Sequence, residues 1–434
     1  MEPQSLAQRL AQLSTADKQR LLAHLLREKA KAQGAQVQSV QQPNWVRDAQ
    51  LDSRIQPLAP AIHCREPECV LLTGATGFLG AHILEELCNQ TTATIYCLVR
   101  AKDDADARQR LHSNFSRYFS HALDTGRVRP LIGDLAQPQL GLSVEIFARV
   151  AEEADVLVHN GAQLHHIASY PQLKASNVDS TVAMLQLATT AKPKWVHYVS
   201  TLVAAVDRDI EGWLLESLPE TDPAELAGGY AQSKWVSEKM LAEAAHRGIG
   251  VTIFRPGFIS GRSDNGTWPL ENDHLLRAIK GCVQMGYASE SKLTPNMAPV
   301  DFVSAAIVRI ALSPLDTGQV FNLSNPHMVS WETILGWLQT CGYGLRIIPN
   351  QIWREQHLEN LDRENALFPI LPLYLGGKTT EQHEGLVSKL AKVRHHNTAR
   401  MLERLEMEFP VIDENLWRRY VRFFEDRRFF PTRA

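Results

Sequence analysis

The chain of 434 residues is 44% hydrophobic and 21% charged, and its formal net charge at pH 7 is −3. At roughly 100–200 residues per domain, this length suffices for two or three domains with a large core, and the composition is that of an ordinary globular protein. The nearly balanced charge excludes a global electrostatic attraction to nucleic acid or to an anionic membrane, so we expect neither as a partner.

Six cysteines are scattered without C-x-x-C spacing. This pattern argues against a disulfide scaffold or structural zinc and favours a reducing compartment. The sequence begins MEPQSLAQRLAQL, without the apolar core or cleavage signal of a secretory peptide. No stretch reaches the roughly 18 uninterrupted apolar residues of a membrane span. We therefore expect a soluble, cytoplasmic protein.

Leucines recur at helical spacing between residues 5 and 32, and a Gln-rich stretch follows over 33–43. This pattern predicts a helical segment and linker over residues 1–45. Two interpretations stay open for residues 1–32: a docking element on a tether, or a helix pair packed on the body of the chain itself.

From Cys69 onward, short apolar runs alternate with helix-sized segments; the runs are CVLLTG, TIYCLVR, VRPLIGDL, DVLVHNGA, KWVHYVS and VTIFRPG. Strands alternating with helices imply a parallel sheet covered on both faces, whose buried strands are almost continuously apolar. We predict an α/β fold: a Rossmann-like, doubly wound parallel sheet over residues 65–262. It is completed by about 300–328, where a helix and the run VFNLSN follow.

The regular alternation ends after Gly261. Residues 263–299 are loop-like, and residues 329–434 are helical in pattern but irregular. We predict that these two stretches form a smaller, mostly helical C-terminal substrate domain. The basic positions there, Lys378, Lys389, Lys392 and Arg394, fit a solvated face better than a docking site for an acidic partner.

The stretch Thr73–Gly80, TGATGFLG, follows a predicted strand and opens a predicted helix. Glycines at this spacing allow a tight turn and let the backbone approach a pyrophosphate at the helix N-terminus. We therefore predict a dinucleotide-binding turn made by Gly74, Thr76, Gly77, Phe78, Leu79 and Gly80.

The second predicted strand ends at Arg100, where an NAD enzyme usually carries an acidic residue for the ribose 2′-hydroxyl. A guanidinium is instead suited to a 2′-phosphate, and Arg110 on the next helix would add a second charge. The expected cofactor is therefore NADPH. Further cofactor contacts are predicted where the third and fourth strands end, at Asp134, Leu135, Asn160, Gly161 and Ala162.

Tyr230 and Lys234 are four residues apart in a predicted helix and so share one face. A tyrosine has a reference pKa near 10, and a neighbouring ammonium that lowers this pKa by ~2–3 units supplies roughly 3–4 kcal/mol. Lys234 would also hold the nicotinamide ribose. Ser200 and Thr201 end the fifth strand, where a hydroxyl would face the nicotinamide. Asn177 is a candidate brace for the helix that carries the pair.

In their order along the chain, these motifs resemble the extended short-chain dehydrogenase/reductase superfamily: TGATGFLG, GDL, HNGA, SNVDST, YVST, YAQSK, FRPG and PVDFV. Within it, the chain is most similar to thioester reductase domains, the terminal domains of nonribosomal peptide and polyketide synthases and of carboxylic acid reductases. The stretches typical of these domains are CLVRA, YAQSKWVSEKML, FRPGFISGRSDNGTWPLENDHLLRAIKGC and the C-terminal MEFPVIDENLWRRYVRFFEDRRFFP.

The resemblance implies that Thr201, Tyr230 and Lys234 are the catalytic residues, and it selects Thr201 over Ser200. It places Pro256, Gly257 and Ile259 against the nicotinamide. The implied substrate is an acyl or peptidyl thioester on the phosphopantetheine arm of a carrier protein, reduced to an aldehyde, with a second hydride transfer giving an alcohol. It also supports synthase docking through residues 1–32. No metal is required, and His165 with His166 lacks the spacing of a metal site.

Two other hypotheses remain. A nucleotide-sugar epimerase or dehydratase would share the superfamily motifs, but an NAD-retaining enzyme fits Arg100 less well. A non-catalytic NADP-sensing protein would keep the fold but tend to lose the pair Tyr230 and Lys234, which this chain retains.

Overall fold

The computed structural model describes residues 45–60, 63–165, 168–222, 226, 228–271, 273–313, 320–375 and 392–431. The helical segment predicted over residues 1–32 lies outside the described residues, as do His166, Lys378 and Lys389. Of residues 1–45, the structure describes Trp45, where the short helix α3 (Trp45–Asp48) begins. Among the described helices, none combines the length and the apolar composition of a membrane span.

The centre of the molecule is a seven-stranded parallel sheet with strand order β10-β6-β5-β4-β1-β2-β3. This is the doubly wound arrangement that the strand–helix alternation predicts, and the run VFNLSN supplies its last strand. The strands are β1 (Cys69–Thr73), β2 (Thr94–Val99), β3 (Val128–Ile132), β4 (Val156–His159), β5 (Trp195–Val199), β6 (Val251–Pro256) and β10 (Val320–Leu323).

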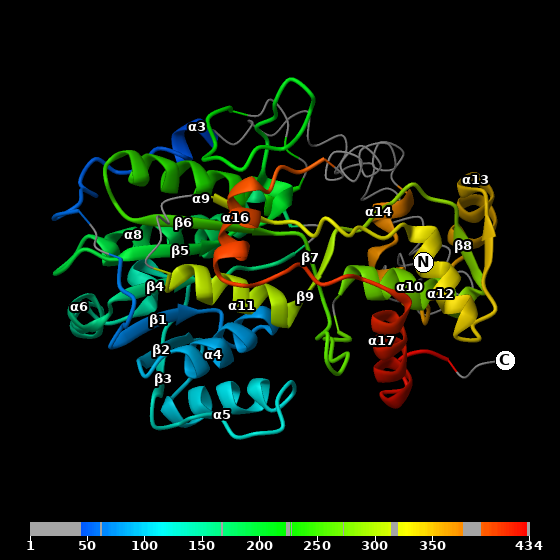
Figure 1. The fold of residues 1–434 in the computed structure, drawn as a ribbon, viewed down its shortest axis with the longest axis horizontal. Helices are drawn as coiled ribbons and strands as arrows, with labels where there is room; N and C mark the ends of the chain where they lie inside the picture. The colour runs from blue at the N-terminus through cyan, green and yellow to red at the C-terminus, as the bar shows by residue number, and fades with distance from the viewer. Residues whose placement is uncertain are drawn as a thin grey trace, which may run out of the picture.

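Helices cover both faces of the sheet (Figure 1). Alternate residues of a strand point to opposite faces, so Leu71 belongs to one core while Val70 and Leu72 belong to the other. The first core contains α6 (Val144–Glu153), α8 (Ser180–Ala188) and α9 (Gly229–His246); the second contains α4 (Phe78–Gln90), α5 (Asp104–Phe115) and α11 (Val300–Ala311).

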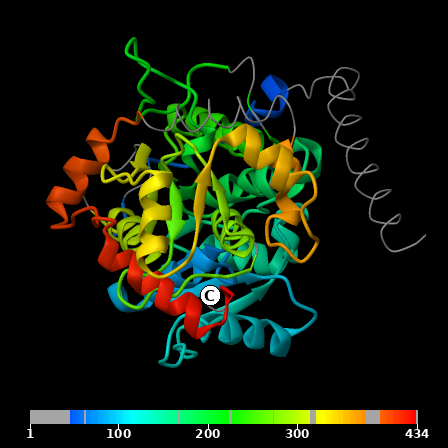
Figure 2. The ribbon, with the colours of Figure 1, turned by 90° about the vertical axis from the view of Figure 1, so that its right-hand side faces the viewer.

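A third apolar core lies beyond the end of the sheet, where the remaining helices gather (Figures 1 and 2). These are α10 (His274–Met285), α12 (Trp331–Thr340), α13 (Asn350–Trp353), α14 (Pro372–Leu375) and α17 (Glu414–Asp426), with the paired strands β8 (Tyr287–Ser289) and β11 (Arg346–Ile348). Strands β7 (Phe258–Ser260) and β9 (Met297–Pro299) pair with each other. Helix α16 (His396–Arg404) differs, because its Met401 and Leu402 pack into the core beneath the sheet.

Short helical segments lie in the connections of the sheet: η1 (Pro138–Gly141), α7 (Tyr170–Lys174), the π-helical η2 (Ala175–Asp179) and η3 (Leu202–Ala204). The π-helical η4 (Arg354–Leu358) and η5 (Phe368–Ile370) belong to the third core.

The turn between β1 and α4 is closed by a close backbone approach. Gly74 has a φ of 80°, a conformation that glycine adopts without strain. A Cβ at Gly80 would lie 1.9 Å from the Gly74 carbonyl oxygen. The first turn of α4 therefore packs directly on the backbone of the preceding loop, which only glycine at position 80 permits.

We expect Gly80→Ala to lower the free energy of unfolding by about 3 kcal/mol or more, because the added methyl group forces the helix away from the turn. Urea denaturation measures this loss. The matched control is Gly336→Ala within α12, where a Cβ would meet nothing within 4 Å. That change should raise stability by up to about 1 kcal/mol. Equal stabilities of the two variants would contradict the close packing at Gly80.

Candidate active site

The glycine turn after β1 lies against the end of β4. The Thr73 hydroxyl is 2.8 Å from His159 Nδ1 and accepts a 2.9 Å hydrogen bond from the Gly161 backbone N–H. A Cβ at Gly74 would be 2.7 Å from Asn160 Nδ2. Two segments that the sequence assigns to the cofactor thus meet at the carboxyl edge of the sheet, as expected for neighbouring parallel strands.

The other residues of the glycine turn flank the start of α4. Gly77 is exposed at the N-cap of this helix and donates to the Gly74 carbonyl at 2.9 Å. Phe78 packs on the ring of Tyr118, while Leu79 packs on the core beneath the sheet. Thr76 is half-buried. The backbone of this turn is therefore accessible at Gly77, where a pyrophosphate is predicted to bind.

A side chain that the sequence analysis missed holds α5 beside this turn. Asn114 Nδ2 donates to the carbonyl oxygens of Ala75 at 3.2 Å and Gly77 at 3.1 Å. It lies in the last turn of an amphipathic helix, where an asparagine gives no sequence signal of such a contact.

Arg100 and Arg110 lie exposed at the end of β2 and on α5. No hydrogen bond or ion pair joins either guanidinium to another described residue, whereas the neighbouring Arg108 donates to Asp104 at 2.7 Å. Both predicted phosphate ligands are therefore available for an anion.

The loop after β3 approaches the loop after β4. A Cβ at Gly161 would lie 2.8 Å from Leu135 Cδ1, so these two predicted cofactor residues are adjacent. Asp134 is half-buried, and its Oδ1 accepts from the Ala136 backbone N–H at 3.0 Å. Ala162 is also half-buried.

Tyr230 and Lys234 lie in the first turns of α9, which begins after Gly228 with a φ of 82°. Burial raises the pKa of the Tyr230 phenol to about 12. Burial also lowers the pKa of the Lys234 ammonium to about 7, against the attraction of Glu238. Lys234 Nζ donates to the Val199 carbonyl at 2.7 Å. The lowering of the Tyr230 pKa by Lys234 therefore stays a prediction.

Thr201 and Ser200 differ in what their hydroxyls contact. Ser200 is buried, and its hydroxyl donates to Glu238 Oε1. Thr201 is half-buried at the N-cap of η3, where its Oγ1 accepts from the Val203 N–H at 3.4 Å. The Thr201 hydroxyl keeps its own proton available for donation, which favours Thr201 over Ser200 as a substrate ligand.

Asn177 braces α9, as the sequence suggests. Its Oδ1 accepts from the Gln163 backbone N–H at 2.7 Å, and its Nδ2 donates to Ser233 Oγ at 2.9 Å. Ser233 in turn donates to the Tyr230 carbonyl at 2.8 Å. The π-helical turn η2 thus links the loop after β4 to the helix that carries Tyr230.

Pro256, Gly257 and Ile259 follow β6 toward β7. A Cβ at Gly257 would lie 2.7 Å from Asn296 Oδ1, and the Phe258 N–H donates to the Asn296 carbonyl at 2.6 Å. Pro256 is buried and Ile259 half-buried. This segment therefore packs closely against Asn296, the residue that precedes β9.

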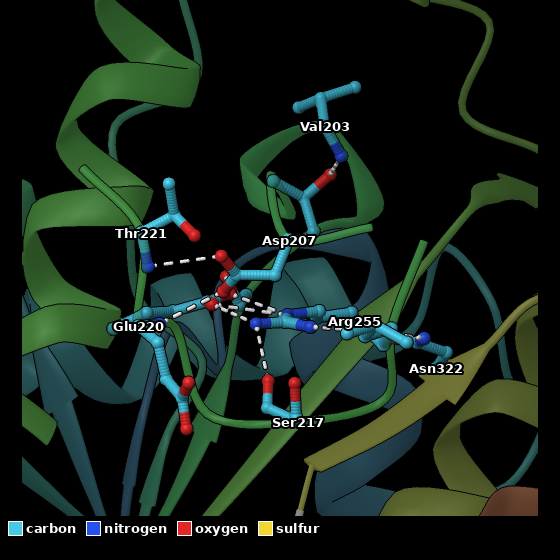
Figure 3. Close-up of polar contacts among 11 residues, drawn as sticks. Val203, Asp207, Ser217, Glu220, Thr221, Arg255 and Asn322 are labelled. Carbon is cyan, nitrogen blue, oxygen red and sulfur yellow. Dashed lines mark hydrogen bonds and ion pairs between the residues drawn. The ribbon is translucent and has the colours of Figure 1, made fainter. Parts of the chain in front are cut away.

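Beneath these residues lies an ion pair that the sequence analysis did not single out. Arg255 Nη2 is 2.5 Å from Glu238 Oε2, and the two side chains are 2% and 0% exposed. Arg255 also donates to the carbonyl oxygens of Leu215 and Ser217, each at 3.2 Å (Figure 3). The pair has no signal in the sequence, because Glu238 is one charged residue in an ordinary helix pattern and Arg255 is one charged residue in an ordinary strand pattern.

The loop over residues 201–222 folds back on itself between β5 and α9. Asp207 accepts from the backbone N–H groups of Glu220 at 2.9 Å and Thr221 at 3.0 Å (Figure 3). Leu214 forms bridges to Arg208 and to Val393. The loop is thereby tied both to itself and to the C-terminal part of the chain.

Among the described residues, no group of three or more His, Cys, Asp or Glu side chains is placed to hold a metal ion. His165 is exposed. The six cysteines all lie in described segments and form no disulfide.

The fold, the glycine turn and the Tyr–Lys pair define a dinucleotide-binding protein of the extended short-chain dehydrogenase/reductase class. The family described as male sterility protein matches residues 72–307. The chain belongs to this family.

Its relatives are reductases and peptide synthases. It is 33% identical to a linear gramicidin synthase protein of Brevibacillus parabrevis, over 85% of this chain and 7% of that protein. It is 34% identical to the L-2-aminoadipate reductase large subunit of Eremothecium gossypii, over 76% of this chain and 25% of that protein. The chain thus spans a quarter or less of the length of these two relatives.

Among solved structures, the chain is similar to the terminal R domain from the myxalamid PKS-NRPS biosynthetic pathway. The TM-score is 0.80 and the sequence identity 35%, and the match covers 90% of this chain and 99% of that one. The likeness therefore includes the region beyond the sheet and not the Rossmann-like part alone.

A half-buried carboxylate in the loop, that of Glu216, should make stability depend on pH. Glu216 accepts from the N–H groups of Asn322 at 2.7 Å and Asn397 at 2.5 Å, and burial raises its pKa to about 7. A carboxyl whose pKa is raised on folding contributes stability that is full below its unfolded pKa and is lost as the pH rises through the folded value.

Relative to Glu216→Gln, whose side chain stays neutral, the wild type should therefore lose about 3 kcal/mol between about pH 5 and pH 8. Urea denaturation across this range measures the difference. Glu403→Gln, at an exposed position of α16, controls for the change in overall charge. A constant difference between wild type and Glu216→Gln would show that Glu216 does not bind a proton on folding.

Proposed function

We propose that this chain is an NADPH-dependent reductase that reduces an acyl or peptidyl thioester to an aldehyde and so releases the chain from a carrier protein. One observation carries the proposal: the glycine turn and Thr201 follow strands of one parallel sheet at its carboxyl edge, and Lys234, one helical turn after Tyr230, donates to Val199 at the end of β5. The likeness to a terminal R domain and to two synthase and reductase proteins supports it.

The residues at this edge fit a nicotinamide dinucleotide carrying a 2′-phosphate. The turn at Gly74 and Gly80 leaves no room for side chains and exposes backbone at Gly77, which suits a pyrophosphate. Arg100 and Arg110 carry free guanidinium groups that suit the phosphate. When bound, NADPH supplies the hydride. Residues 65–262 with 300–328 would hold it, and residues 263–299 and 329–434 would enclose the substrate.

The reaction follows from the side chains around the substrate carbonyl. The hydroxyls of Thr201 and Tyr230 donate to the carbonyl oxygen and stabilise its negative charge as the thioester becomes a thiohemiacetal. Tyr230 gives its proton to this oxygen, and the Lys234 ammonium stabilises the phenolate that results. The Tyr230 phenolate takes this proton back as the thiohemiacetal collapses, which expels the thiolate of the phosphopantetheine arm and leaves the aldehyde. With a second NADPH bound to supply another hydride, the same side chains would support reduction of the aldehyde to an alcohol.

The partner is accordingly a carrier protein that presents its phosphopantetheine thioester. The relatives are a peptide synthase and a reductase of which this chain matches only a part, and we infer that docking to such an assembly involves residues 1–32. The protein is proposed to act in the cytoplasm.

Tyr230→Phe should lower the rate of thioester reduction by about 10²–10⁴-fold, and Thr201→Ala by about 10²–10³-fold, because each removes a donor to the developing oxyanion. NADPH consumption with an acyl-pantetheine or a carrier-loaded thioester measures the rate. Tyr96→Phe is the matched control, since the hydroxyl of this β2 residue donates to Glu153 and not to the site. Full activity of Tyr230→Phe, or a wild type inactive on every loaded carrier, would refute the proposal.

Arg100→Ala should raise the KM for NADPH by about 10–100-fold and change the KM for NADH little, because a charge-assisted contact to the 2′-phosphate is lost. Initial rates with the two cofactors measure the preference. Arg108→Ala on α5 is the control, since Arg108 pairs with Asp104. An unchanged NADPH preference in Arg100→Ala would place the 2′-phosphate elsewhere.

A further inference from the structure

The ion pair of Glu238 and Arg255 joins α9, the helix that carries Tyr230 and Lys234, to β6. Arg255 Nε is 3.1 Å from both carboxylate oxygens of Glu238, and Nη2 is 2.5 Å from Oε2. Burying two charges costs free energy that their mutual attraction often fails to recover, and well-packed apolar residues are frequently as stable. Stability alone is therefore a weak explanation for this pair.

Glu238 occupies the same face of α9 as Tyr230 and Lys234. The three residues follow at intervals of four, so Lys234 has Tyr230 one turn before it and Glu238 one turn after it. Glu238 acts electrostatically on Lys234 and favours its ammonium form. The ion pair of Glu238 is with Arg255, whose positive charge opposes the attraction of this carboxylate for Lys234.

The ion pair also forms hydrogen bonds with the end of β5 and with the loop over residues 201–222. Glu238 Oε1 accepts from the hydroxyl of Ser200, the residue before Thr201. Arg255 precedes Pro256 and holds the carbonyl oxygens of Leu215 and Ser217 in the loop. One buried contact thus connects β5, β6, α9 and the loop over residues 201–222.

We propose that Glu238 is a positioning residue that keeps Lys234 protonated in the site through its buried negative charge, and that Arg255 limits this effect because its own charge opposes that of Glu238. The inference rests on the proposed reductase function. It adds that Glu238 and Arg255 together set the protonation state of Lys234.

The groups that face Lys234 support this assignment. From β5, the ring of Tyr198 lies 4.5 Å from Nζ. From β4, His159 is fully buried, and burial together with Lys234 lowers its pKa to about 3. Burial raises the pKa of Tyr198 above its ordinary value. Both groups are therefore neutral near pH 7, and among the described residues around Lys234, Glu238 is the anion.

The two partners should shift the Lys234 pKa in opposite directions. Glu238→Gln removes the attracting carboxylate and leaves the Arg255 charge, so the pKa of Lys234 should fall by about one unit or more. Arg255→Gln leaves the carboxylate to Lys234 alone, so its pKa should rise. A purely structural role of the pair would lower activity without moving the pKa in opposite directions.

The experiment measures the pH dependence of kcat for NADPH-dependent thioester reduction in the full-length chain. Glu238→Gln should move the alkaline loss of activity to lower pH by about one unit, and Arg255→Gln should move it to higher pH. Shifts in the same direction, or no shift in either variant, would overturn the proposal. Glu243→Gln is the matched control, because it breaks another Glu–Arg pair, that of Glu243 with Arg247 at the C-terminal end of α9.

Arg255→Gln leaves a buried carboxylate without its partner and is liable to unfold. The double variant Glu238→Gln/Arg255→Gln removes both charges and so leaves no unpaired buried carboxylate. Its pH profile can be compared with that of Glu238→Gln even if Arg255→Gln does not fold. Its alkaline inflection should lie above that of Glu238→Gln, in which the Arg255 charge still repels Lys234. An inflection equal to that of Glu238→Gln would overturn the opposing effect of Arg255.

A second readout does not depend on turnover. Lysine labelled with ¹³C at Cε is titrated by NMR in the wild type and the variants, and the Lys234 signal is identified by its absence in Lys234→Met. The same opposite shifts are expected. If the wild type reduces no thioester yet the Lys234 signal shifts as described, the proposed function fails while the role of Glu238 stands. If turnover is normal and the signal does not shift, the role of Glu238 fails.

Discussion

A single buried arginine–carboxylate contact joins segments of this protein that lie far apart in the chain. Arg255 on β6 and Glu238 on α9 are 2% and 0% exposed, and Arg255 also holds the loop carbonyls of Leu215 and Ser217. Breaking such a pair on one side leaves an uncompensated buried charge, which is strongly destabilising. The contact therefore fixes how α9 packs against β6, and it also holds the loop that contains Leu215 and Ser217.

The sheet supplies the other half of this arrangement. In a doubly wound parallel sheet, every strand delivers the residues that follow it to the same edge. The order β5-β4-β1 places Thr201, Asn160 and the Gly74 turn next to one another. Helix α9 packs on one face of the sheet, where Asn177 contacts its Ser233 and Ser200 contacts its Glu238. The strand order brings the predicted cofactor turns together, and the buried polar contacts fix the helix that carries Tyr230 and Lys234.

Sequence reasoning was sufficient where the signal is local. The alternation of apolar runs and helices predicted the sheet, and TGATGFLG predicted the turn whose Gly80 has no room for a side chain. It missed Glu238, Arg255 and Asn114, because each takes its meaning from a partner distant in the chain. It also could not decide which core an amphipathic helix joins: α16 packs beneath the sheet, although its neighbours in sequence surround the third core.

The state of Lys234 links this architecture to the chemistry. A lysine buried among neutral groups would lose its proton near neutral pH, and the pKa of Lys234 is lowered to about 7. The Val199 carbonyl accepts from Nζ and the Glu238 carboxylate attracts it, so each stabilises the ammonium, and in the proposed reaction the Tyr230 phenolate would do so as well. The phenolate is the acceptor that exists only after proton transfer, so its attraction to Lys234 favours the products of that step over the resting site. The ammonium form of a lysine is stabilised most by this last acceptor when the pKa of the lysine lies close to the ambient pH. A carboxylate that is paired with Arg255 keeps the Lys234 pKa in that range, whereas an unpaired carboxylate would raise it further.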